Sequence, residues 1–298
     1  MDKKEEIKGD QQMKKAYEAS SQLLRRRLAK ERPEDLTILD GIKESDVIVV
    51  EGIYDHAQVN FRLANIPHSV ISPRQLDQLE FSGDELIFIN CPGDGFSEIG
   101  LEILQSFVKR GGMLITTDWA LKHVLERAFP DYVEFNNRPT PDDVVRVEIL
   151  DGGENSFIHS VIDATDDPQW WLEGSSYPIK VINQEKVKIL VNSREMKEKY
   201  GESPIIVSFK YGEGEIIHMT SHFYLQRTET RTTRHQASGS SYAMEKGFSP
   251  AEVSDLDLET IKTAEIESAY TSQAFMADLV TKQKKKVNIR KKEAKKEK

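Results

Sequence analysis

Residues 108–120, VKRGGMLITTDWA, decide the fold. Gly111 and Gly112 end a helix that we predict over Ser97–Arg110, because glycine readily adopts the backbone conformation in which helices terminate. The apolar residues Met113–Thr117 then predict a short buried strand. A second predicted helix, Trp119–Phe129, follows at once, so Asp118 lies at the turn between strand and helix.

The residues before this stretch show the same alternation of predicted strands and helices. Short apolar runs predict strands at Asp46–Gly52, His68–Ser72 and Glu85–Asn90, and residues 56–65 are expected to be helical. Continuous apolar runs are typical of strands buried on both faces. Alternation of such strands with helices predicts βαβ units and a parallel sheet with helices on both sides.

After Pro130 the pattern becomes rich in β-strands. The predicted strands are Val144–Leu150, Phe157–Ile162, Pro178–Ile182, Val187–Asn192, Ile205–Lys210 and Glu215–Ser221. The last two flank the glycine turn of residues 211–214 and predict a hairpin. We expect these strands to extend the first sheet rather than to form a second domain.

Composition divides the chain into three parts. Residues 1–35 are expected to form an N-terminal helical arm, and 36–281 the α/β domain, with a polar loop at 228–256 and a closing helix at 257–281. Residues 282–298 contain ten Lys/Arg and two Asp/Glu, a charge of +8, and predict a disordered basic tail. With a net charge of −9, the remaining 281 residues carry −17. Such an acidic body argues against a protein built mainly to bind nucleic acid.

Further limits come from what the sequence lacks. No apolar run is long enough to span a membrane, the first residues lack the apolar core of a signal peptide, and Cys91 is the single cysteine. We therefore expect a cytoplasmic protein without an internal disulfide.

Three pieces of the chain carry a resemblance to a known family. They are residues 90–93 (NCPG) after a strand, residues 108–120, and residues 211–222 (YGEGEIIHMTSH). Their order and spacing resemble the class I glutamine amidotransferase-like superfamily over about residues 46–226. The resemblance implies an α/β three-layer sandwich with a mostly parallel sheet, flavodoxin/amidotransferase-like, here with N- and C-terminal helical appendages.

The catalytic positions depart from the family pattern. The resemblance places Asp118 where the family has its nucleophilic cysteine, and His222 where it has the catalytic histidine. The acidic partner expected two residues later is replaced by Tyr224. A triad needs nucleophile, base and orienting group together. The chain therefore resembles a degenerate member, and we expect no glutamine hydrolysis.

The ends of parallel strands meet at one edge of a sheet, where ligands bind. We expect eight side chains to converge there: Tyr54, Asp55, His56, Asn90, Cys91, Asp118, Trp119 and His222.

Several interpretations of these side chains stay open. Asp118 either caps the following helix or acts as a nucleophile, since its Asp-Trp pair also resembles the haloalkane dehalogenases. Asp55, His56, Asp118 and His222 are of the types that bind divalent metals, but no fixed motif supports such a site, so we expect neither metal nor cofactor. Cys91 is either a reactive thiol or a small buried residue.

Our first interpretation of function is a non-catalytic, protein-binding or scaffold component of a larger assembly. Its partners would be proteins bound by the N-terminal helix and the C-terminal tail, and the tail would also attract an acidic partner, nucleic acid or an anionic membrane. The alternatives are a hydrolase that uses Asp118 as nucleophile and His222 as base, and a small-ligand sensor at the sheet edge.

Overall fold

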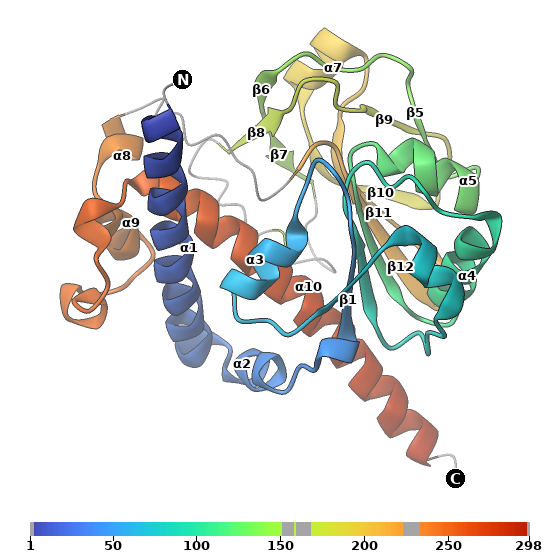
Figure 1. Cartoon of the computed structure of the whole chain (residues 1–298), viewed down its shortest axis with the longest axis horizontal. Helices are drawn as coiled ribbons and strands as arrows, with labels where there is room; N and C mark the ends of the chain where they lie inside the picture. The colour runs from blue at the N-terminus through green and yellow to red at the C-terminus, as the bar shows by residue number, and fades with distance from the viewer. Residues whose placement is uncertain (1–2, 151–157, 159–167, 223–232, 297–298) are drawn as a thin grey trace.

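The computed structural model describes residues 3–150, 158, 168–222 and 233–296, and its centre is an eight-stranded sheet (Figure 1). The strands are β1 (Val47–Val50), β2 (Ser69–Ile71), β3 (Leu86–Ile89), β4 (Met113–Thr117), β7 (Glu148–Ile149), β10 (Val187–Asn192), β11 (Pro204–Tyr211) and β12 (Gly214–Met219). Their order is β2-β1-β3-β4-β12-β11-β10-β7. Neighbours from β2 to β12 are parallel, and the last three strands are added antiparallel. The predicted mostly parallel α/β sheet is confirmed.

Helices cover both faces of the sheet, because its apolar residues point alternately to the two sides. In β1, Val47 and Val49 join one apolar core, and Ile48 and Val50 join the other. The first core is covered by α1 (Lys3–Glu31), α3 (Ala57–Leu63) and α10 (Thr263–Lys296), and the second by α4 (Glu98–Lys109) and α5 (Glu126–Ala128). The expected three-layer sandwich is therefore present.

The second half differs from the expectation in detail. The strands β5 (Val133–Phe135) with β9 (Ile179–Val181), and β6 (Asp143–Arg146) with β8 (Gln169–Leu172), form two separate antiparallel pairs instead of extending the main sheet. Short strands of this kind carry too little pattern to reveal their partners. Of the predicted strand Phe157–Ile162, all but Ile158 lies outside the described residues. The predicted helix Trp119–Phe129 is a π-helical turn over Leu121–Leu125, followed by α5.

The remaining described elements are short. They are α2 (Pro33–Asp40), α7 (Arg194–Tyr200), α8 (Thr233–Gln236) and α9 (Gly239–Glu245), with 3₁₀ turns at Glu44–Asp46, Pro73–Gln78, Pro250–Val253 and Leu258–Thr260. No helix among the described segments combines the length and the apolarity needed to cross a membrane.

The N-terminal helix packs on the body. Leu23 and Leu28 of α1 are buried in the first core, and α1 runs beside α10 (Figure 1). Gln273 of α10 donates to the backbone carbonyl of Tyr17 at 3.1 Å, which fixes the pair in register. The apolar face of α1 is thus packed within the chain.

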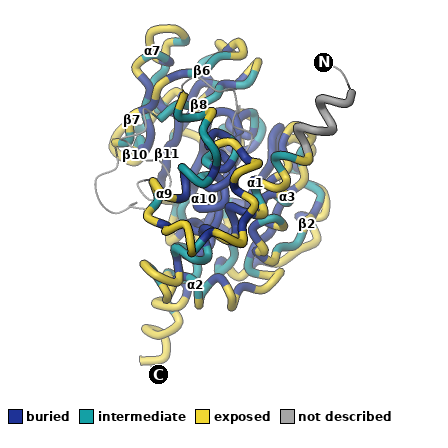
Figure 2. The backbone as a smooth tube through the Cα atoms, turned by 90° about the vertical axis from the view of Figure 1, so that its left-hand side faces the viewer, coloured by how far each residue is buried: buried dark blue, intermediate teal, exposed yellow. Residues whose placement is uncertain are grey.

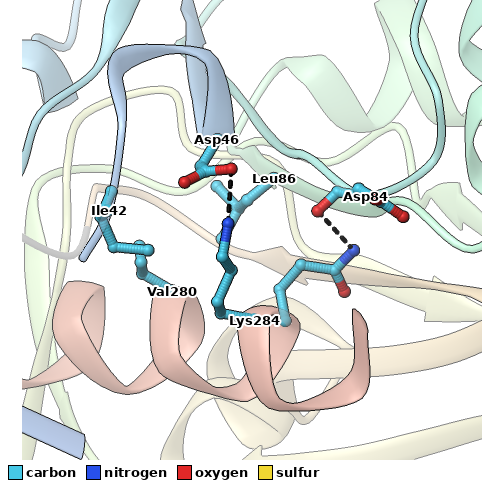
Figure 3. Close-up of a pocket in the computed structure, with 7 residues that line it drawn as sticks. Ile42, Asp46, Asp84, Leu86, Val280 and Lys284 are labelled. Carbon is cyan, nitrogen blue, oxygen red and sulfur yellow. Dashed lines mark hydrogen bonds and ion pairs between the residues drawn. The ribbon is translucent and has the colours of Figure 1, made fainter. Parts of the chain in front are cut away.

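The predicted disordered tail is wrong for the residues described. Helix α10 continues to Lys296, and several of its basic side chains pair with acidic residues of the body. Lys284 lies 2.7 Å from Asp46 beside a small pocket lined by Ile42 and Leu86 (Figure 3). Only the last turns, residues 291–296, are exposed throughout and project from the molecule (Figure 2).

The expected polar loop at 228–256 is also partly folded. Residues 223–232 are not described, but 233–256 contain α8, α9 and a 3₁₀ turn. Tyr242 is buried, and Arg234 pairs with Glu245 at 2.6 Å and with Glu267 of α10 at 3.2 Å. The polar composition of residues 228–256 predicted a loop because it gave little weight to these few residues that anchor the segment.

Candidate functional site

Buried polar side chains meet where β1, β3, β4 and β12 end. Asp55, Cys91, Asp118 and His222 each follow one of these strands, and each is at most 3% exposed. Because the four strands are parallel, their carboxyl ends lie at the same edge of the sheet. The topology therefore brings together four of the side chains that the sequence predicted to converge.

Asp118 occupies a strained turn directly after β4. Its φ is 44°, in the left-handed region that costs energy for a non-glycine residue, and its backbone N–H donates to the carbonyl of Met219 at 2.9 Å. Its carboxylate accepts a 2.7 Å hydrogen bond from the N–H of Tyr177 and a longer one, 3.4 Å, from the Ser176 hydroxyl. Asp118 is thus held by the β8–β9 connection.

Burial is the main reason why the pKa of Asp118 is raised to about 7, and the charge of Glu173 adds to it. The neighbouring His222 and the N–H of Tyr177 oppose the rise. Near neutral pH both protonation states of this carboxyl group are therefore accessible.

His222 lies between two carboxylates. Its Nδ1 is 2.9 Å from Oε2 of Glu173, which is an ion pair when the ring is protonated. Its Nε2 is 3.9 Å from Oδ2 of Asp55. Burial alone would lower the pKa of His222, but Glu173, Asp55 and Asp118 outweigh it and raise the pKa above its usual value.

Glu173 was not predicted from the sequence. We expected the acidic partner of His222 two residues later in the chain, whereas Glu173 follows β8, and its N–H donates to Ser221 Oγ at 3.1 Å. Because this partner comes from a distant turn, no local spacing could reveal it. Thr117 was also missed, and its hydroxyl holds Asp55 through a 2.6 Å hydrogen bond.

Cys91 lies inside the cluster as a neutral thiol. Burial, and after it the charge of Asp118, raises the pKa of Cys91 well above its usual value, although the backbone N–H of Trp119 donates to the sulfur. Cys91, Asp118 and His222 each place one ligand-type atom within 4.8 Å of the others. This environment favours the small buried residue over the reactive thiol.

Aromatic rings border the cluster on its exposed side. The Trp119 ring stacks on Tyr177 at 5.4 Å, and Tyr54, half-exposed, packs edge-on against Trp119 at 5.1 Å. The indole N–H of Trp119 donates to the carbonyl of Ser175 at 2.7 Å. The dehalogenase resemblance implied that this N–H would bind a halide. In this structure it is instead used for a hydrogen bond within the protein.

Two predicted residues do not join the cluster. His56 is exposed. Asn90 is buried, but its amide is used within the fold: its oxygen accepts from the N–H of Ala57 at 3.1 Å and its nitrogen donates to Gln58 at 2.9 Å. Asn90 thus fixes the start of α3 next to the site.

Comparison with known proteins yields relations at the level of fold. No protein-family model and no curated protein matches the chain. A ThuA-like protein from Bacteroides uniformis has a TM-score of 0.45 at 12% identity, over 60% of this chain and 82% of that one. A cytoplasmic protein from Salmonella typhimurium LT2 has a TM-score of 0.44 at 11% identity, over 63% and 91%.

Glycosidases are also among the similar structures. An exo-β-1,4-mannosidase from Opitutaceae bacterium strain TAV5 has a TM-score of 0.39 at 15% identity, over 59% of this chain. The chain spans only 31% of that mannosidase and 27% of a GH42 β-galactosidase. At these identities the likeness concerns the fold alone and assigns no activity.

Proposed function

We propose that this chain is a hydrolase of small esters in which Asp118 is the nucleophile and His222 the acid and base. The observation that carries the proposal is the buried meeting of Asp118 with His222, whose Nδ1 faces Glu173 at 2.9 Å. Nucleophile, histidine and orienting carboxylate form the arrangement that covalent hydrolysis requires. Glu173 thus supplies the third member that the sequence lacked at Tyr224.

The residues suggest a two-step reaction. The Asp118 carboxylate attacks the acyl carbon, a mixed anhydride forms, and the bond to the alcohol breaks. Protonated His222 gives its proton to the departing alkoxide. Neutral His222 then takes a proton from a water molecule that attacks the anhydride, which releases the acid and restores Asp118.

The surroundings favour an uncharged substrate. Asp55, Asp118 and Glu173 give the cluster a negative charge that repels anions, and the rings of Tyr54 and Trp119 offer apolar contact at its border. An ester with a small apolar acyl group fits both features. An amide is a poorer substrate, since a carboxylate is a weak nucleophile toward amides.

The resemblance to the class I glutamine amidotransferase-like superfamily supports the same roles, because it places the nucleophile after β4 and the histidine after β12. The scaffold interpretation gains no support from the described residues, since α1 is packed on α10. A ligand sensor would use the same site without turnover, and the following assay separates the two.

The test is hydrolysis of short-chain nitrophenyl esters, with haloalkanes as a second panel, by chelator-treated protein. We expect Asp118→Asn and His222→Asn to lower kcat at least about a thousandfold, and Glu173→Gln about a hundredfold. Glu34→Gln, on the exposed start of α2, is the matched control and keeps full activity. Absence of ester turnover in the parent protein, or equal turnover in Asp118→Asn, would overturn the proposal.

A further inference from the structure

We propose that Cys91, Asp118 and His222 form a binding site for Zn²⁺ or a similar transition-metal ion. The three residues offer one sulfur, one oxygen and one nitrogen atom, all within 4.8 Å of one another and all buried. In a tetrahedral zinc site, with bonds of about 2.0–2.3 Å, neighbouring ligand atoms lie roughly 3.3–3.8 Å apart. Shifts of about an ångström in side-chain position therefore suffice to close the site around an ion.

The orientation of His222 is the second, independent observation. Its side chain is 1% exposed, and among the described residues its Nε2 makes no hydrogen bond. Its Nδ1 faces Glu173 at 2.9 Å. Metal-bound histidines commonly present one nitrogen to the ion and the other to a carboxylate, which fixes the ring. The Glu173 contact thus leaves Nε2, which lies 3.9 Å from Oδ2 of Asp55 without a hydrogen bond, as the nitrogen available to a metal.

The donor set selects the class of metal. A thiolate and an imidazole favour Zn²⁺ or Co²⁺ over Mg²⁺ and Ca²⁺, which prefer oxygen ligands. No lysine or arginine pairs with Asp118 or Glu173 in the part of the chain that the structure describes, so a metal cation would not have to displace one of these side chains. Binding would replace the proton of the Cys91 thiol, as it does at other zinc cysteines.

Three protein ligands leave a fourth position open, which is typical of zinc sites that also bind water or substrate. The ion would bind to Asp118 and His222, the two side chains that the proposed ester hydrolysis requires. We therefore expect Zn²⁺ to inhibit the hydrolase and a chelator to restore it. The metal site itself does not depend on that activity.

The experiment is a titration of metal-free, full-length protein with Co²⁺, followed by absorption spectroscopy. We expect one Co²⁺ per chain and a sulfur-to-cobalt charge-transfer band in the near ultraviolet. Cys91→Ser should lose the band, and His222→Gln should weaken Co²⁺ binding at least about tenfold. His56→Gln, an exposed histidine near the site, is the control and should leave the spectrum unchanged.

A melting curve provides a second readout if one variant folds poorly. Zn²⁺ should raise the Tm of the parent and His56→Gln proteins, but not that of Asp118→Asn or Cys91→Ser, because a ligand stabilises only the state that binds it. No Co²⁺ binding by the parent, or the same charge-transfer band in Cys91→Ser, would refute the site. Ester hydrolysis is measured separately on chelated protein, so failure of one proposal does not imply failure of the other.

Discussion

His218 connects the stability of the sheet to pH. It lies in β12, fully buried, with Nδ1 2.8 Å from the hydroxyl of Thr116 on the neighbouring strand β4. Burial lowers its pKa to about 3. The ring therefore stays neutral in the folded protein, while the unfolded chain takes up a proton below about pH 6.5.

This difference predicts a loss of stability in acid. Between about pH 6.5 and pH 3 the unfolded state binds more protons at His218, so the free energy of unfolding falls by up to about 1.4 kcal/mol per pH unit from this residue. Above pH 6.5 its contribution is constant. We expect the free energy of unfolding of His218→Gln, measured by denaturant titration at several pH values in this range, to fall less steeply with decreasing pH than that of the parent protein. Equal slopes in both proteins would contradict the assignment.

A glycine at the start of β12 permits close approach of two segments. A Cβ atom at Gly214 would lie 2.0 Å from the backbone carbonyl oxygen of Val108, so the strand or the end of α4 would have to move. We expect Gly214→Ala to lower the free energy of unfolding by about 1–3 kcal/mol. Gly41→Ala, whose nearest neighbours are 3.5 Å away, should change it by less than about 0.5 kcal/mol in the same urea titration.

The sequence predicted Asp118 and His222 because each follows a strand with a clear apolar pattern. It did not predict Glu173, whose turn adjoins the site only after β8 and β12 have been positioned. It expected no metal site, because metal motifs are recognised by local spacing. Cys91, Asp118 and His222 come from separate strand ends and have no such spacing.

At the scale of elements, the last part of α10 is held by polar contacts. Arg290 donates to the carbonyl of Arg110 at 2.7 Å and to that of Gly83 at 3.2 Å, and it pairs with Asp84. Gln283, two turns earlier on the same face of the helix, donates to the carbonyl of Gly111 at 3.1 Å. These contacts fix α10 against the loops before β3 and β4.

Removing one of these contacts tests the docking. Arg290→Ala leaves the Arg110 and Gly83 carbonyls without this donor, and we expect the free energy of unfolding to fall by about 1–2 kcal/mol. Lys295→Ala, on the exposed last turn, should have no measurable effect. Thermal melts of both variants check this, and equal melting temperatures would mean that the helix end is free in solution.

The charge of residues 282–298 explains why the tail was predicted to be disordered. Counted alone, +8 in 17 residues predicts self-repulsion and solvation. The body carries −17, however, and Asp35, Asp46, Asp84 and Glu215 meet this basic segment. Complementary charge on a distant surface cannot be read from the composition of the segment itself.

At the scale of the whole molecule, the alternation of strands and helices up to Phe129 sufficed to predict the parallel half of the sheet. Each buried strand there has its own apolar run and a glycine or proline at its boundary, so local pattern and global fold agree. The pairs β5–β9 and β6–β8 were not predicted. Their strands have only three or four residues each, and tertiary contacts rather than local pattern determine which strands pair.

The pairing of α1 with α10 has a consequence for synthesis on the ribosome. Gln273 and Tyr17, which hold the two helices together, are 256 positions apart, so α1 emerges long before its partner exists. Until then the leucines that α1 buries in the folded protein are exposed to solvent. During translation α1 is thus a nascent amphipathic segment suited to binding by a chaperone. It can leave the chaperone and pack in its final place only after α10 has been synthesised.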